Sequence, residues 1–151
     1  AEAAGQVAEK GFERLREHTG IEYIKDSTGD LVRLQQLVAK GVKVFNGADP
    51  LVFAALTAGS TGCIVGGMNA LPRELARVHG LVKRAAYDEA MELWERILPA
   101  CIHFWTHEYN ATVKAATNRM GYPVGPCRKP IQPLTQQQMA DVEHVLPVGS
   151  F

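Results

Sequence analysis

The chain has 151 residues, 46% of them hydrophobic, and its sixteen basic and sixteen acidic side chains leave no net charge. A chain of this size can bury one sizeable core, and its charge balance argues against a nucleic-acid partner. No apolar run approaches the roughly twenty residues of a membrane span, so we expect no membrane association.

The first half of the sequence predicts a helix followed by a strand–helix unit. Residues 1–18 have the composition of a helix that is already under way. A short strand then ends at Lys25, and a capping box from Ser27 to Asp30, with Ser27 as the N-cap, predicts the next helix. Gly41 is expected to end that helix.

Two further strand–helix units follow. Strands are predicted over 42–45 and 63–65, and helices from about Asp49 and from about Pro72. The unit recurs about every twenty residues, a spacing that suits parallel βα units and an α/β fold.

From residue 72 to about residue 120, helical periodicity replaces the strand signals, and Pro99 is expected to kink one of the helices. Residues 122–134 hold four prolines and are predicted to form an extended connector. Thr135 and Gln138 form a second capping box that predicts a final helix.

Lys25 is the first candidate for a catalytic residue. Strand alternation places it on one face with Ile21 and Tyr23, at the carboxyl end of a strand where α/β folds carry their chemistry. Desolvation by such neighbours would lower the pKa of a lysine amine, ordinarily near 10.4, and expose a nucleophilic lone pair. The alternative is a lysine stem on apolar surface with its ammonium in water.

Several motifs in one order resemble the second half of the dihydrodipicolinate synthase and N-acetylneuraminate lyase family. The resemblance covers roughly residues 12–146 and is carried by residues 24–30, 46–49 and 59–64, Asn69, Pro72, Asn110, Lys114, Gly121 and 128–135. It implies the C-terminal part of a (β/α)8 TIM barrel, about three βα units, followed by a helical C-terminal extension. We therefore expect a partial barrel over 1–71, and the last barrel helix with the extension over 72–151.

The resemblance also implies a chemistry. Lys25 matches the lysine that forms a Schiff base with pyruvate or another 2-keto acid in class I lyases, aldolases and synthases, which need no metal or other cofactor. Gly47 and Ile64 match positions that line the keto-acid pocket. Asp49 matches a position that can touch substrate hydroxyls, although a plain helix N-cap is an alternative role for it. Gly66 stands where the sugar-acid lyases offer a hydroxyl, which disfavours a sialic-acid substrate.

The length of the chain departs from the family. A barrel of eight units typically needs about 250 residues, and the carboxylate-binding loop and proton-relay tyrosine of the family's first half have no counterpart here; Tyr23 and Tyr109 stand in the wrong context. We expect a piece of a longer protein, whose open sheet is covered by the missing N-terminal half or by other subunits in a homo-oligomer. The alternative is a noncatalytic half-barrel or helical module that binds a partner.

Cysteine and histidine spacing indicates neither disulfides nor a metal site. Cys63, Cys101 and Cys127 are widely spaced, which suits buried thiols in a reducing cytoplasm. His103 and His107 lie one helical turn apart, but no third zinc ligand is evident.

Overall fold

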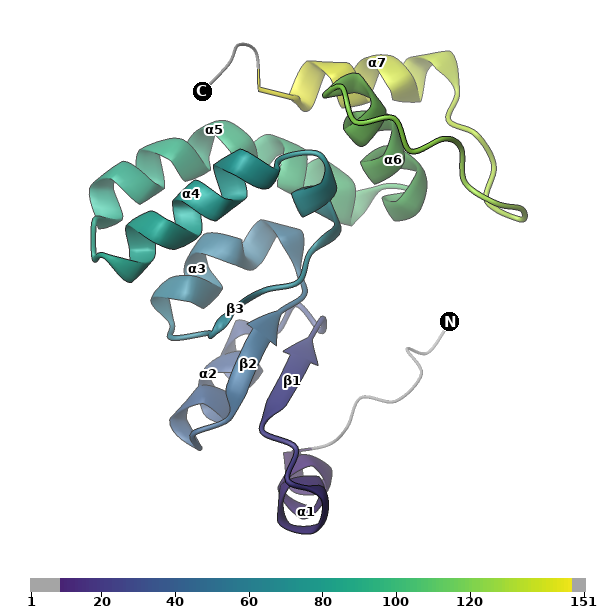
Figure 1. Cartoon of the computed structure of the whole chain (residues 1–151). Coiled ribbons are helices and arrows are strands. Elements are labelled where there is room, and N and C mark those ends of the chain that lie inside the picture. Colours follow the sequence, from purple (N-terminus) through teal and green to yellow (C-terminus); the bar gives the residue numbers. More distant parts are fainter. Residues whose placement is uncertain (1–8, 148–151) are drawn as a thin grey trace.

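The computed structural model describes residues 9–147, in which strands and helices alternate at first and helices alone follow (Figure 1). The elements are α1 (Glu9–Thr19), β1 (Tyr23–Asp26), α2 (Leu31–Ala39), β2 (Lys43–Asn46), the 3₁₀ turn η1 (Asp49–Leu51), α3 (Val52–Thr57), β3 (Gly62–Cys63), the 3₁₀ turn η2 (Gly66–Asn69), α4 (Pro72–Lys83), α5 (Tyr87–Thr106), α6 (Tyr109–Arg119) and α7 (Gln136–Val145).

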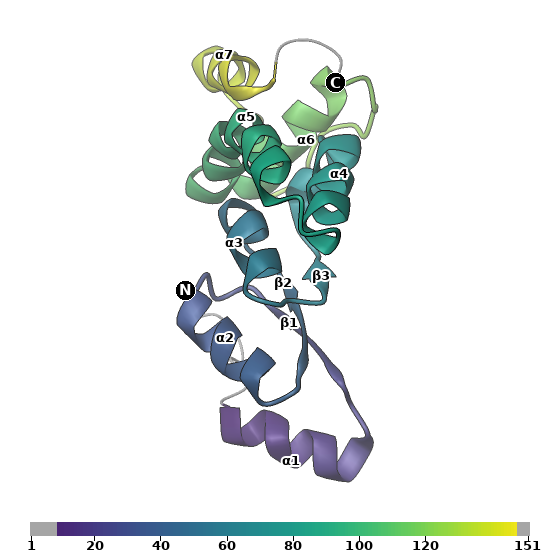
Figure 2. The same ribbon diagram turned by 90° about the vertical axis from the view of Figure 1, so that its left-hand side faces the viewer.

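The three strands form one parallel sheet in the order β1-β2-β3, as the spacing of the units predicts. Lys25 is paired with Phe45, and Phe45 with Gly62. The third strand is shorter than predicted and begins one residue earlier. Both views place α4 to α7 beyond the carboxyl ends of the strands, far from α1 (Figures 1 and 2).

The two faces of the sheet have opposite environments. Asp26, Val44 and Asn46 are buried on the face that α2 and α3 cover, both helices lying on the same side of the strands (Figure 2). Tyr23 and Lys25 lie on the opposite face and are exposed, Tyr23 by 51%. Parallel sheets are normally covered on both faces, whereas among residues 9–147 only one face of this sheet is covered.

The start of α2 corrects the predicted N-cap. Asp30, and not Ser27, caps the helix, because the Asp30 side chain accepts a hydrogen bond from the Arg33 amide at 3.0 Å. The Asp26 carboxylate accepts from the Thr28 amide at 2.9 Å and holds residues 26–28 in a turn, which delays the helix. Gly41, with a φ of +74°, follows the helix end as predicted.

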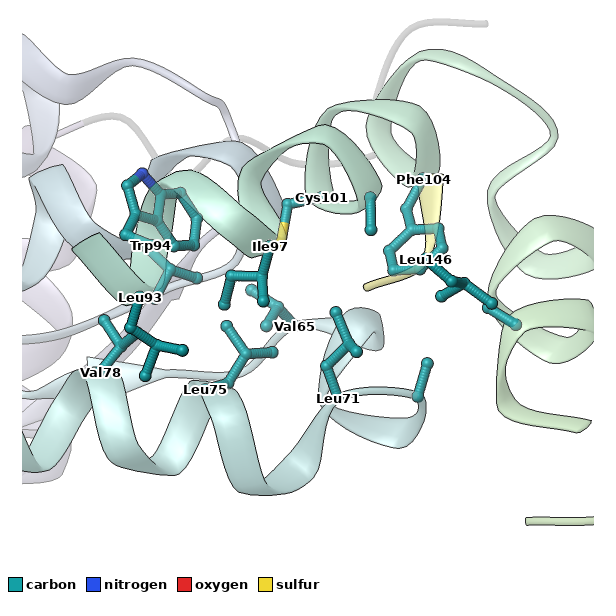
Figure 3. Close-up of a cluster of buried hydrophobic side chains, with 14 of the residues drawn as sticks. Val65, Leu71, Leu75, Val78, Leu93, Trp94, Ile97, Cys101, Phe104 and Leu146 are labelled. Atoms are coloured by element: carbon teal, nitrogen blue, oxygen red, sulfur yellow. The ribbon is translucent and has the colours of Figure 1, made fainter. Parts of the chain in front are cut away.

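The largest core lies among the helices of the second half. Figure 3 shows side chains of α4 and α5 interdigitating, with Leu75, Ile97 and Phe104 each at most 1% exposed. Each such side chain stabilises the fold by about 1.5–3 kcal/mol through burial. α5 continues through Pro99 as a single helix, and that proline is exposed.

The last helix begins as predicted. The Thr135 hydroxyl accepts from the Gln138 amide, and the Gln138 side chain accepts from the Thr135 amide, which completes the capping box. Of the helix predicted over 1–18, residues 9–19 are helical and the first eight lie outside the described residues. The boundary predicted at residue 71 stays a prediction. Within 9–147, the helices are too short or too polar to cross a membrane.

Candidate functional site

Lys25 and Gly47 meet at the carboxyl edge of the sheet. The Gly47 amide donates to the Asp26 carbonyl at 2.7 Å, which places this glycine beside the end of β1. A Cβ at residue 47 would lie 2.7 Å from Cε of Lys25 and would also collide with the Ser27 hydroxyl. Glycine at this position therefore leaves the space that the lysine stem occupies.

The lysine amine is accessible in this chain. Lys25 is exposed, because among residues 9–147 nothing covers its face of the sheet. Ile21 and Tyr23, the neighbours expected beside it, are themselves 42% and 51% exposed. In this chain, a carbonyl compound can reach the amine from the open face.

Ile64 lies beside the other two predicted residues. Its amide donates to the Asn46 carbonyl at 2.8 Å, one residue before Gly47, and the Ile64 residue is 50% exposed. The ends of three adjacent strands thus bring Lys25, Gly47 and Ile64 to one edge.

Asp49 is the buried polar centre of this end of the molecule. Its Oδ1 accepts from the Gly67 amide at 2.7 Å, and its Oδ2 accepts from the Tyr109 hydroxyl at 2.7 Å. The same hydroxyl accepts from the Gly66 amide at 2.7 Å. These contacts tie the turn after β2 to the turn after β3 and to the first residue of α6.

The environment shifts the pKa values of both side chains. Burial raises the pKa of Asp49 above its usual range, while the Tyr109 hydrogen bond, the Gly67 amide and the charge of Lys25 partly offset this effect. Burial and the hydrogen bond to Asp49 raise the pKa of Tyr109 to about 12. The tyrosine hydroxyl is the donor of the hydrogen bond between them.

This geometry overturns the helix N-cap interpretation of Asp49. Ala48 occupies the cap position of the first turn, and the Asp49 side chain instead makes tertiary contacts. Sequence reasoning missed Tyr109 as its partner. The available signal was the Gly66-Gly67 pair after a strand, which leaves room for close approach by other side chains.

A cavity of about 700 Å³ opens beside this network. Tyr109 forms part of its wall, with Asn110 of the same helix and with Arg128 and Lys129 of the connector. Lys114 also lines the cavity, and its amine donates to two connector carbonyls, at Val124 and Pro126. The connector that the prolines predict is thus held against α6.

The cysteines and paired histidines do not form a second site in the described part of the chain. Burial raises the pKa of Cys63 to about 11 and that of Cys101 further, so both thiols stay protonated at neutral pH. Cys101 is buried as expected, but Cys63 and Cys127 are only partly so. The His103 and His107 rings stack at 4.1 Å, and no group of three metal-binding side chains occurs within 9–147.

A family model for the dihydrodipicolinate synthetase family matches residues 4–148, nearly the whole chain. The chain belongs to the dihydrodipicolinate synthetase family. The resemblance inferred from the motifs is therefore confirmed. A 4-hydroxy-tetrahydrodipicolinate synthase from Acidovorax sp. (strain JS42) is 34% identical over 136 residues, which are 88% of this chain and 46% of that protein.

Two solved structures, one of a synthase and one of an N-acetylneuraminate lyase, have the same fold as this chain over their aligned parts. A 4-hydroxy-tetrahydrodipicolinate synthase from Methylacidiphilum fumariolicum SolV aligns with 90% of this chain and 47% of its own, at a TM-score of 0.82 and 24% identity. An N-acetylneuraminate lyase from Fusobacterium nucleatum aligns with 95% of this chain and 50% of its own length. The TM-score of this alignment is 0.78 and the sequence identity is 23%. The expected fold, part of a TIM barrel with C-terminal helices, is confirmed. The chain spans about half the length of these proteins.

Proposed function

We propose that this chain is the lysine-bearing part of a class I lyase or synthase that acts on pyruvate or a related 2-keto acid. The observation that carries the proposal is the position of Lys25: its amine stands at the carboxyl edge of the sheet, above a glycine that a side chain could not replace. Family membership supports the same assignment.

The proposed chemistry needs only this amine and a ketone. The Lys25 nitrogen adds to the carbonyl carbon, and loss of water leaves an imine. Once protonated, the imine withdraws electrons from the adjacent carbon, so a carbon–carbon bond can be made or broken there without a metal. Gly47 and Ile64 are proposed to line the keto-acid pocket, and Asp49 to lie behind it.

The remainder of the site is proposed to come from outside residues 9–147. The open face that carries Tyr23 and Lys25 is the surface against which the other half of a barrel, or another subunit in a homo-oligomer, would pack. The unpaired cysteines fit a reducing, cytoplasmic location, which we propose as well.

Borohydride trapping tests the covalent step. The full-length protein that contains this chain, treated with pyruvate and borohydride, should carry a reduced adduct on Lys25 in peptide mass mapping. Lys25→Arg keeps the charge but cannot form the imine, and should lose the adduct and at least about a thousandfold of activity.

Lys43→Arg is the matched control, because Lys43 lies on the same face of the neighbouring strand, hydrogen-bonded to Glu22 at 2.6 Å. It should keep the adduct. An unmodified Lys25 in the wild-type protein would refute the enzyme assignment and favour a noncatalytic binding module.

A further inference from the structure

Asp49 has no exposed surface, and it follows by two residues Gly47, the glycine against which the Lys25 stem lies. Gly67 occupies one oxygen and Tyr109 the other. Protein added to this chain does not expose Asp49 as long as the network keeps its arrangement. A molecule bound to Lys25 can therefore reach the buried carboxylate only by displacing a group that covers it, such as the Tyr109 hydroxyl.

Tyr109 holds its place through two hydrogen bonds of opposite sense. Its hydroxyl donates to Asp49 and accepts from the Gly66 amide, both at 2.7 Å. An alcohol group of a substrate can make the same pair of bonds, one as donor and one as acceptor. The position that the tyrosine hydroxyl fills is thus suited to a substrate hydroxyl, and it is already taken.

The two glycines make this arrangement possible. A Cβ at residue 66 would lie 2.5 Å from the Tyr109 hydroxyl oxygen, and a Cβ at residue 67 would lie 2.6 Å from Oδ1 of Asp49. Real Cβ atoms essentially never approach so closely, so a side chain at residue 66 would push the tyrosine away from Asp49. The tyrosine and the glycines therefore act as one unit.

We propose that Tyr109 is a specificity-determining residue that occupies a hydroxyl-binding position beside the imine-forming lysine, so that the site accepts 2-keto acids without hydroxyl groups and excludes polyhydroxylated ones. The inference rests on the proposed function. Its physical basis is a competition, because a hydrogen bond to a buried carboxylate is worth more than one to water, and the tyrosine forms it without loss of translational freedom.

The test compares two six-carbon 2-keto acids as ligands of the full-length protein. A 2-keto-3-deoxyhexonate carries hydroxyl groups along its chain, and 2-oxohexanoate carries none. The measurement is the concentration of each that gives half-maximal borohydride trapping on Lys25, where the six-carbon adduct and any three-carbon pyruvate adduct left by aldol cleavage of the hydroxylated ligand are counted together by mass. Tyr109→Phe should shift the ratio of the two concentrations about tenfold or more toward the hydroxylated ligand, the range expected for one hydrogen bond to a charged group.

Two further variants separate specificity from simple destabilisation. Tyr122→Phe makes the same chemical change at an exposed connector tyrosine and should leave the ratio unchanged. Gly66→Ala displaces the Tyr109 hydroxyl without removing it and should shift the ratio in the same direction as Tyr109→Phe, so the test survives if one variant does not fold.

The outcomes are distinct. If pyruvate labels Lys25 but the ratio is unchanged in Tyr109→Phe and in Gly66→Ala, the specificity role is wrong and the proposed function stands. If pyruvate does not label Lys25 in the wild-type protein, the proposed function falls and this inference falls with it.

Discussion

At the scale of single residues, Asp49 and Tyr109 form a hydrogen-bonded pair in which Asp49 is buried. The two are 60 positions apart, and their hydrogen bond links the end of the sheet to α6. Because the carboxylate is buried and the phenol keeps its proton to high pH, the pair makes stability depend on pH.

The first prediction concerns alkaline unfolding. The pKa of Tyr109 is about 12 in the folded chain and near 10 when unfolded, so between these values the unfolded state releases a proton that the folded state retains. The contribution of Tyr109 is therefore complete below pH 10 and is lost as pH rises to about 12. Urea unfolding across this range should show a smaller pH-dependent loss for Tyr109→Phe than for the wild type.

Tyr122→Phe is the control and should follow the wild-type curve, since this side chain is exposed in the connector. Identical slopes for the wild type and Tyr109→Phe would mean that the buried hydrogen bond does not exist in solution.

At the scale of elements, a helix start that depends only on neighbouring residues is predictable from the sequence, whereas one that depends on more distant contacts is not. The capping box at Thr135 involves groups only three residues apart, and it forms as predicted. The predicted N-cap of α2, Ser27, lies three residues before the true one, Asp30. The reason is that Asp26 holds the preceding turn, and its carboxylate also pairs with Arg33, seven residues along the chain, at 3.0 Å.

The second prediction is for the start of α7. Thr135→Ala removes the side chain that accepts from the Gln138 amide, and should lower the free energy of unfolding by about 1 kcal/mol. Chemical denaturation measures this loss. Gln136→Ala, at the next and exposed position, should change stability by less than about 0.5 kcal/mol. Equal effects of the two substitutions would show that the cap has no special role.

At the scale of the whole molecule, the chain has a well-formed helical core and an incomplete sheet. The side chains of α4 and α5 that Figure 3 labels are buried, whereas Ile21, Tyr23 and Ile64 are each at least 42% exposed near the open edge and face of the sheet. Within residues 9–147 the sheet has one uncovered face and two unpaired edges, and such a sheet favours association with another protein surface.

The third prediction follows from that surface. The isolated chain should bind a hydrophobic dye and sediment as species larger than a monomer, and both signals should decline in a full-length protein that covers the face. Tyr23→Glu with Ile64→Glu should reduce dye binding, because charge is placed on the open side. Val32→Glu is the matched control, at a 64% exposed position on α2, and should leave dye binding unchanged.

A monomeric isolated chain with no dye signal would contradict this account. It would mean that the open face is closed by a rearrangement of the chain itself.

Sequence by itself determined the alternation of strands and helices, the end of α2 before Gly41, the lysine near the end of β1 and the capping box of α7, because all of these depend on neighbouring residues. Only the tertiary structure decided the role of Asp49, its partnership with Tyr109 and the exposure of Lys25. Those features depend on which distant segments pack together, and periodicity and capping signals carry information over only a few residues.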